Sequence, residues 1–146
     1  MASAWLGLEV LALGDGHATV AMTLRAEMMN GFGITHGGMI FSLADSAFAL
    51  ACNPSDYTPS DCTPPNGAAN TVTVASGADI NFLGPTRAGQ RLTAVANRRQ
   101  QSGRSGLYDV QVFAENDDGT AVVAEFRGRS RTIPSPRTGQ ERSLPQ

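Results

Sequence analysis

The longest apolar segment of the sequence runs from Gly38 to Cys52 and has the pattern of a helix. It contains no proline, and every residue in it is apolar or glycine except Ser42, Asp45 and Ser46. A segment of this length without breakers is typical of an α-helix, and a helix that is apolar on all sides is normally buried. The pattern predicts one long helix surrounded by protein, with a carboxylate near its middle.

Much of the remaining sequence alternates between apolar and polar positions, as half-buried strands do. It predicts an N-terminal hairpin with strands over 5–13 and 17–25, joined at Gly14-Asp-Gly16. Four more strands are predicted after the helix, over 71–83, 91–99, 107–115 and 120–132. Two strands, one long helix and four strands predict an α+β fold, in which an antiparallel sheet of five to six strands curls around a central helix.

Length and composition predict a single globular domain. The chain has 146 residues, of which 41% are hydrophobic and 16% are charged. We expect the domain to span residues 1–133. The segment 54–70 is rich in proline and serine and is expected to be a mobile surface loop, and the polar tail 134–146 is expected to be disordered.

Charge and cysteine content exclude several kinds of chemistry. The formal net charge is -2, and all 11 basic residues are arginine, so a lysine Schiff base is excluded and nucleic acid is not an expected partner. Cys52 and Cys62 are too few for a disulfide framework or a metal cluster, and we expect no metal and no cofactor. The N-terminal residues lack the features of a signal peptide or membrane span, so a soluble, cytoplasmic protein is predicted.

Asp45 is the first candidate for chemistry. An unpaired carboxylate in an apolar core costs several kcal/mol, so Asp45 should face a polar cavity or an interface. One interpretation is structural, with Asp45 accepting hydrogen bonds from backbone amides of another chain. The other is chemical, with Asp45 as a general base or nucleophile whose pKa responds to its apolar surroundings.

The Gly37-Gly38 pair stands at the predicted start of the helix. Backbone N–H groups there have no intrahelical acceptor, and the helix dipole is positive, so they can stabilise a developing oxyanion. Glycine also lets a substrate carbonyl approach closely. A tight turn that needs glycine is the alternative interpretation.

Three kinds of polar residue, histidine, asparagine and arginine, carry weaker signals. His36 could act as an acid, a base or an orienting donor, or could be structural. Asn30 could position a water or a carbonyl, or could be a turn residue. Arg104 lies in a glycine-containing turn. Three further arginines share one face of the last predicted strand, namely Arg127, Arg129 and Arg131. The turn and the strand face each fit either phosphate binding or an ordinary solvated surface.

The helix and the segment before it carry a longer motif, Asn30-Gly-x-x-x-x-His36-Gly-Gly-x-x-Phe-Ser-Leu-Ala-Asp45-Ser-Ala-Phe-Ala-x-Ala-Cys-Asn53. With Asp79-Ile-Asn-Phe-Leu-Gly-Pro85 and Phe126-Arg-Gly-Arg-Ser130, this motif strongly resembles the hot dog-fold acyl-CoA thioesterases of the phenylacetate-degradation type. The resemblance covers nearly the whole domain. It implies a dimer with a continuous sheet, usually paired into a tetramer, in which each active site takes residues from both subunits.

The resemblance also implies roles for residues in the hydrolysis of phenylacetyl-type or other small to medium acyl-CoA thioesters. Asp45 matches the catalytic carboxylate, Gly37 the amide that polarises the thioester carbonyl, and Asn30 the asparagine associated with the attacking water. Whether Asp45 is a general base or a nucleophile is left open. The other positions implied to bind substrate are His36, Gly38, Ser46, Phe82, Gly84, Arg87, Arg104, Ser105 and Gly106.

The sequence departs from the family pattern at three places. Relatives often have arginine before the proline of the Phe-Leu-x-Pro turn, whereas this chain has Gly84, so a coenzyme A phosphate contact is missing or moved to Arg87. The segment after Asn53 is longer than expected, and no leading helix is expected before the first strand. A hot dog hydratase or dehydratase and a non-catalytic acyl-CoA-binding module are the alternatives, although such a module is expected to lack the helix carboxylate that Asp45 supplies.

Overall fold

The computed structural model describes residues 2–54 and 71–135, and the rest of the predicted 54–70 loop and 134–146 tail lies outside the described residues. β6 extends to Pro134, which pairs with Thr71, so the first residue of the predicted tail still belongs to the last strand. In chain order the elements are α1 (Ala2–Leu6), β1 (Glu9–Gly14), β2 (His17–Thr23), the 3-10 helix η1 (Ala26–Met28), α2 (Gly37–Cys52), β3 (Thr71–Phe82), β4 (Arg91–Ser102), β5 (Ser105–Asn116) and β6 (Gly119–Pro134).

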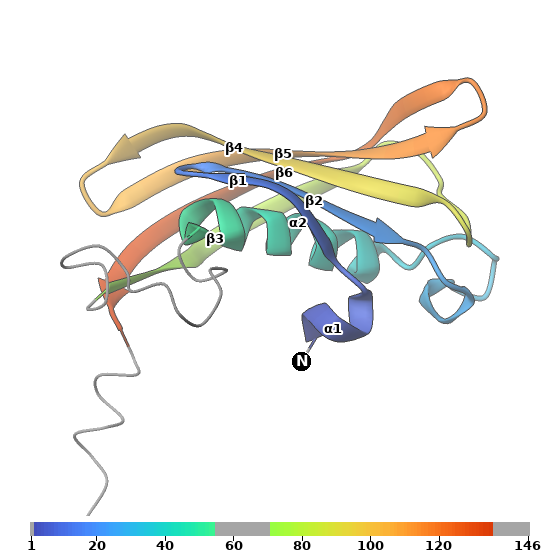
Figure 1. The fold of residues 1–146 in the computed structure, drawn as a ribbon, viewed down its shortest axis with the longest axis horizontal. Helices are drawn as coiled ribbons and strands as arrows, with labels where there is room; N and C mark the ends of the chain where they lie inside the picture. Colours follow the sequence, from blue (N-terminus) through green and yellow to red (C-terminus); the bar gives the residue numbers. More distant parts are fainter. Residues whose placement is uncertain (1, 55–70, 136–146) are drawn as a thin grey trace, which may run out of the picture.

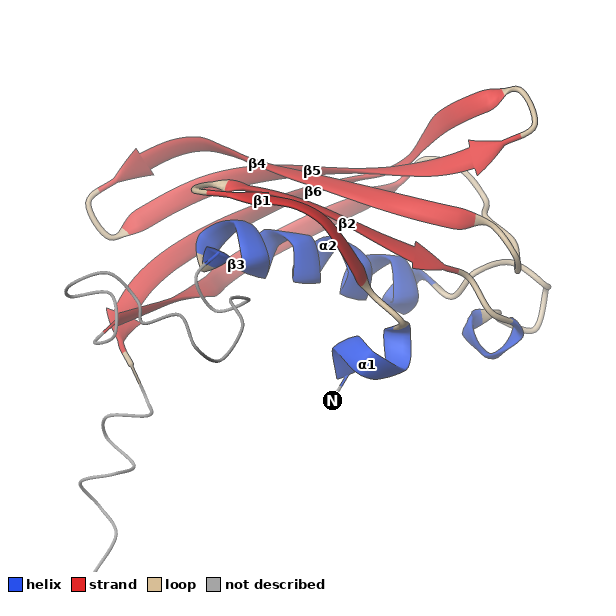
Figure 2. Cartoon of the chain, viewed as in Figure 1, coloured by secondary structure: helices blue, strands red, loops and turns tan. Residues whose placement is uncertain are grey.

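The strands form one antiparallel sheet of six strands in the order β1-β2-β4-β5-β6-β3. The sheet curves over α2, which lies lengthwise against its inner face (Figure 1, Figure 2). This arrangement confirms the predicted α+β fold, a sheet around one long central helix. The long strand β3 is at one edge of the sheet, and the short strand β1 is at the other.

The core lies between α2 and the inner face of the sheet. The ring of Phe48, on α2, packs against Tyr108 and Phe126 of the sheet with ring centroids 5.2 and 5.8 Å apart. Gly128 on β6 leaves room for this ring, because a Cβ there would overlap it. Alternating residues of β4 and β5 are all buried, namely Leu92, Ala94, Ala96, Tyr108, Val110 and Val112.

The prediction was wrong at the N-terminus. Trp5 belongs to the short helix α1, and β1 begins only at Glu9, so the expected absence of a leading helix is also wrong. Short apolar runs fit a helical turn as well as a strand, and Gly7, with φ of 67°, ends the turn in the left-handed region. Arg25 holds α1 in place, since its guanidinium lies 4.6 Å from the Trp5 ring centroid and donates to the Trp5 carbonyl at 2.6 Å.

The helix α2 is covered on one face only within the described part of this single chain. Its sheet-facing residues are fully buried, whereas Met39, Phe41, Asp45, Ser46 and Leu50 are only partly buried and Ala49 is exposed. The prediction of a helix surrounded by protein is therefore not met by one copy. The buried residues are Ile40, Leu43, Ala44, Ala47, Phe48 and Ala51.

Candidate functional site

The segment before α2 is shaped by Asn30. Its side-chain oxygen accepts hydrogen bonds from the backbone N–H groups of Phe32 and Ile34, at 2.8 and 3.3 Å. The Asn30 N–H also donates to the Ile34 carbonyl at 2.8 Å. Asn30 thus has the turn-forming role that was one of its two interpretations, and its oxygen is committed to the loop.

The first turn of α2 is capped by His36. Its ring Nδ1 accepts a hydrogen bond from the Gly38 N–H at 3.2 Å, so this nitrogen is unprotonated in the capping state. The His36 N–H donates to the Met28 carbonyl at 2.8 Å, which ties the start of the helix to η1. The Gly37 N–H finds no acceptor among the described residues, and it stands at the positive end of the helix dipole.

Gly37 lies directly against another side chain. A Cβ at this position would be 3.0 Å from Cζ of Phe82, the last residue of β3. Phe82 is 51% exposed, so its ring has space to rotate away from such a Cβ. The edge strand β3 and the start of α2 therefore meet at this point.

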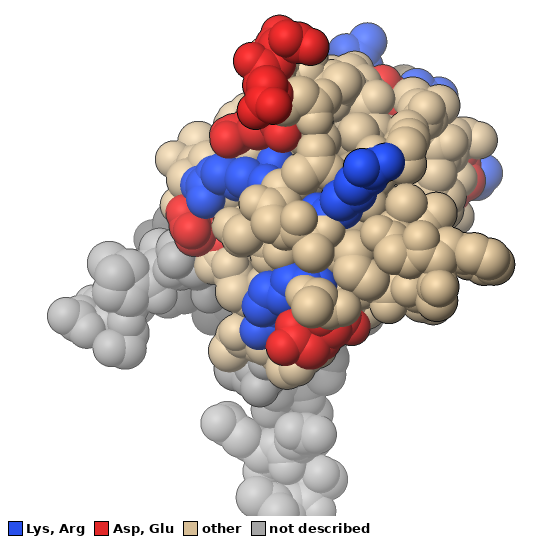
Figure 3. Space-filling model, turned by 90° about the vertical axis from the view of Figure 1, so that its right-hand side faces the viewer, with Lys and Arg blue, Asp and Glu red and all other residues tan. Residues whose placement is uncertain are grey.

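A cavity of about 550 Å³ opens beside Gly37. Its lining is mainly apolar, with the backbone of Gly37 and the hydroxyl-bearing residues Thr35 and Thr86 as the polar part. This end of the molecule is shown in Figure 3, where small groups of both charge signs interrupt a largely uncharged surface. The lining consists of Ile34, Thr35, Gly37, Ile40, Phe82, Leu83, Gly84, Pro85 and Thr86.

Asp45 lies on the face of α2 that the sheet leaves uncovered. Its side chain is half-buried, and desolvation raises the pKa of the carboxyl above the ordinary value of 3.8. Within residues 2–54 and 71–135, no side chain or backbone group hydrogen-bonds or ion-pairs with it. Asp45 follows Gly37 by eight residues, about 12 Å along the helix at 1.5 Å per residue, and it does not line the cavity beside Gly37.

Ser46 and Gly38 take part in contacts within the helix. The Ser46 hydroxyl donates to the Ser42 carbonyl at 2.7 Å, and the Ser42 hydroxyl donates to the Gly38 carbonyl at 2.8 Å. Back-bonding of this kind satisfies serine hydroxyls inside a helix. Gly38 is exposed, and its N–H is used by the cap.

The other predicted substrate-binding residues fall into two groups at opposite ends of the sheet. Phe82, Gly84 and the exposed Arg87 are near the start of α2, whereas Arg104 lies in the β4–β5 turn at the far end (Figure 1). The neighbouring Ser105 and Gly106 line a separate cavity of about 340 Å³. One chain therefore does not bring all the predicted residues together.

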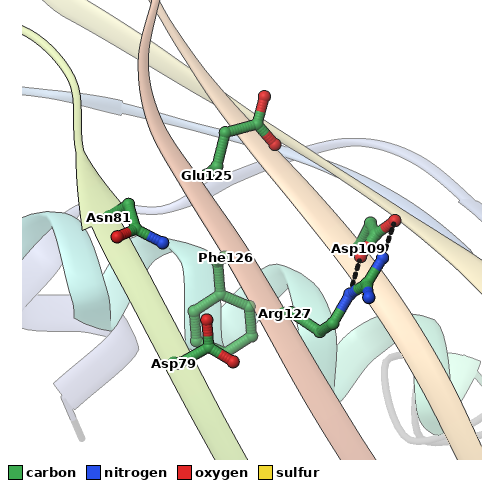
Figure 4. Close-up of a pocket in the computed structure, with 6 residues that line it drawn as sticks. All are labelled: Asp79, Asn81, Asp109, Glu125, Phe126 and Arg127. Atoms are coloured by element: carbon green, nitrogen blue, oxygen red, sulfur yellow. Dashed lines mark hydrogen bonds and ion pairs between the residues drawn. The ribbon is translucent and has the colours of Figure 1, made fainter.

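The three arginines of β6 share the outer face of the sheet, as predicted, since all three are exposed and the residues between them are buried. Arg127 is ion-paired with Asp109 of the neighbouring strand β5, with Nε–Oδ1 and Nη2–Oδ2 distances of 2.7 and 3.2 Å. These two residues border a shallow polar cavity of about 300 Å³ (Figure 4). Its other lining residues are Asp79, Asn81, Glu125 and Phe126.

Sequence reasoning missed the residues that complete the cavity beside Gly37. Thr35 and Thr86 are far apart in the sequence, and neither belongs to a helix or strand with a readable period. A possible signal for Thr86 was its place directly after the Gly84-Pro85 turn. Among the described residues, no group of three or more His, Cys, Asp or Glu side chains is arranged to hold a metal ion, and no helix of that part of the chain is long and apolar enough to cross a membrane.

The six-stranded antiparallel sheet packed on one long central helix is a hot dog fold. A model of the thioesterase superfamily matches residues 32–121, and the chain belongs to this superfamily. The acyl-coenzyme A thioesterase PaaI of Escherichia coli is 38% identical over 135 residues, which cover 92% of this chain and 84% of that protein.

Solved structures agree with this placement. The structure of E. coli PaaI, from the phenylacetic acid degradation operon, has a TM-score of 0.74 and covers 90% of this chain and 83% of its own. A variant of the phenylacetic acid degradation protein PaaI from Thermus thermophilus is 35% identical, with a TM-score of 0.72 and coverage of 88% and 96%. A Streptococcus mutans protein bound to acetyl CoA has 19% identity and a TM-score of 0.70, with coverage of 88% of this chain and 90% of its own. At this identity the likeness shows only a common fold. The resemblance stated from the sequence is thereby confirmed.

Proposed function

We propose that this protein hydrolyses acyl-CoA thioesters to a free acid and coenzyme A, with small to medium acyl groups of the phenylacetyl type as its substrates. The observation that carries the proposal is the Gly37 N–H, without an acceptor among the described residues, at the start of α2 beside a cavity of about 550 Å³. Its volume lies within the range of about 300–1,000 Å³ that is usual for small-molecule sites. The 38% identity to an acyl-coenzyme A thioesterase supports the same reaction.

In the proposed reaction the Gly37 N–H donates to the thioester carbonyl oxygen, where negative charge develops. Asp45 either takes a proton from a water whose oxygen attacks the carbonyl carbon, or attacks that carbon itself to form an anhydride that water then opens. In both routes the C–S bond breaks and coenzyme A leaves as a thiolate, which needs no strong general acid. The pKa of Asp45, raised by its apolar surroundings, suits a proton acceptor.

The active site is proposed to be shared between two subunits. Gly37 and Asp45 of one chain are eight residues apart, about 12 Å along the helix, and Asp45 does not line the cavity beside Gly37. None of the described residues that line this cavity carries a carboxylate. A second copy, joined through the edge strand β3, would cover the open face of α2 and bring its Asp45 to the Gly37 of the first.

The same pairing would assign the remaining candidates. A two-fold contact between β3 and β3 of a second copy makes these two strands antiparallel, so it sets the Phe82 end of one copy beside the Thr71 end of the other. Arg87 of one subunit, and Arg104 with Ser105 and Gly106 of the other, are then candidates for the coenzyme A phosphates. His36 and Asn30 support the loop, and only the amide nitrogen of Asn30 is left to contact a water. A tetramer of two dimers and a cytoplasmic location stay predictions.

The test is release of free thiol from phenylacetyl-, benzoyl-, acetyl- and decanoyl-CoA by the purified protein. We expect turnover that is highest with phenylacetyl- or another small to medium acyl group, and a loss of several orders of magnitude in Asp45→Asn. Asp118→Asn, at an exposed carboxylate in the turn between β5 and β6, is the matched control and should turn over like the wild type. Tight binding of these thioesters without turnover by the wild type would instead support the non-catalytic alternative.

A further inference from the structure

Two loops meet at the end of the sheet where α2 begins. One joins β2 to α2 (residues 24–36), and the other joins β3 to β4 (residues 83–90). Backbone hydrogen bonds hold them together at one side, with Leu24 N–H donating to the Gln90 carbonyl and Gly89 N–H to the Leu24 carbonyl, each at 2.8 Å. The second connection is a pair of buried threonines.

The Thr86 hydroxyl donates to the Thr35 hydroxyl at 2.6 Å, and the Thr35 N–H donates to the Thr86 carbonyl at 3.0 Å. Thr86 is only 1% exposed and Thr35 only 8%. Thr35 in turn directs its hydroxyl toward the sulfur of Met29 at 3.9 Å. Apolar side chains such as valine would fill the same space without hydroxyls that need partners, so packing alone does not explain this pair.

The threonine pair lies between the start of α2 and the wall of the cavity. Thr35 precedes Gly37 by two residues, and Thr86 follows Gly84-Pro85, which form a wall of the cavity. The helical backbone points the Gly37 N–H out of the N-terminal end of α2, but the lateral position of this N–H depends on where the chain enters the helix. His36 is fixed on one side by Met28, and the threonine pair fixes the other side to the cavity wall.

We propose that the Thr35–Thr86 hydroxyl pair positions the Gly37 amide relative to the cavity, so that the donor and the wall beside the bound acyl group move as one unit. This inference rests on the proposed role of Gly37. Neither threonine touches the reacting atoms in this account; they are positioning residues. An oxyanion donor is effective only when it is held in place before the reaction.

The perturbation is Thr86→Val, which removes the hydroxyl and keeps the shape. Displacing a reacting group by about 1 Å costs up to about 10²-fold in rate, so we expect kcat to fall roughly 10- to 100-fold with KM little changed. Thr86→Ser should restore kcat. Thr19→Val is the matched control, because it removes a hydroxyl that contacts His17 at 3.3 Å on the outer face of β2, and its kcat should equal that of the wild type.

A second measurement does not depend on turnover. In protein labelled with ¹⁵N-glycine, the Gly37 amide resonance should shift or broaden in Thr86→Val and return to its wild-type position in Thr86→Ser. Loss of kcat in both Thr86 variants alike, or an unchanged Gly37 resonance in Thr86→Val, would overturn the inference. If the wild type turns over no thioester, the proposed function fails, whereas the Gly37 resonance still decides whether the pair positions this amide.

Discussion

Gly37→Pro removes the proposed oxyanion donor while leaving the helix able to form. Gly37 is the first residue of α2, and proline is favoured at this position because the N–H that it lacks has no helical acceptor. The preceding His36 has φ of -62° and ψ of 127°, an extended conformation that a following proline accepts. The variant therefore should fold with α2 intact and without the Gly37 N–H.

The matched control is Gly37→Ala. A Cβ at Gly37 would be 3.0 Å from the Phe82 ring, so both variants push on Phe82, but only Gly37→Pro loses the donor. The Phe82 ring is half-exposed and can rotate away, so we expect a modest effect from alanine. Removing one oxyanion-hole donor costs about 10²- to 10³-fold in kcat, or about 2.7–4 kcal/mol, and this should be the difference between the two variants.

The assay is thiol release at saturating acyl-CoA, with far-ultraviolet circular dichroism to check that both variants are folded. The expected outcome is a kcat for Gly37→Pro that is at least 100-fold below that of Gly37→Ala, about the lower limit for one donor. Equal kcat values in two folded variants would refute the role of the Gly37 amide. The loss would then come from the Cβ and its contact with Phe82.

Three further predictions concern Asp45 and the core. Since burial raises the pKa of Asp45, activity should rise with pH through a midpoint above 3.8, and a midpoint at or below 3.8 in the pH–kcat profile would contradict this. The folded state disfavours the charged form of the Asp45 carboxyl, so protonation of this carboxyl stabilises the fold. This stabilisation is fully present below pH 3.8 and is lost as the pH rises through the raised pKa of Asp45. Asp45→Asn should accordingly raise Tm at pH 7 but not below pH 3.8 in thermal unfolding, and a lower Tm at pH 7 would contradict it. Gly128→Ala should destabilise the fold by about 1–3 kcal/mol in urea unfolding because its Cβ overlaps the Phe48 ring. Gly14→Ala on β1, whose Cβ meets only the His17 Cβ at 3.9 Å, should have little effect. Equal losses of stability in the two variants would exclude this cause.

The strands and the long helix were predictable because their residues follow clear periods. The inward-facing Leu92, Ala94 and Ala96 alternate strictly, and Gly38 to Cys52 lacks breakers. The N-terminal turn was not predictable, because five residues are too few to separate a helical period from a strand. Its anchor, the stacking of Arg25 on Trp5, connects residues 20 positions apart.

The candidate site was predictable in part. Gly37 and Asp45 could be singled out from the chemistry of a helix start and of a carboxylate in an apolar segment. The Thr35–Thr86 pair could not, because it joins two loops 51 residues apart and no local pattern marks it. The uncovered face of α2 was predictable only in part. Asp45 indicated a cavity or an interface, but the apolar residues around it do not tell whether the same chain or another copy buries them.

The most direct test of the shared active site is complementation between two inactive variants. Asp45→Ala and Gly37→Pro chains with different affinity tags are co-expressed, and mixed assemblies are isolated over both tags. In a mixed dimer with shared sites, one site has both residues intact, so activity should return to about half of the wild-type value per dimer. If each site lies within one chain, every site in the mixed dimer lacks one group, and activity that stays at the level of the single variants would contradict the account.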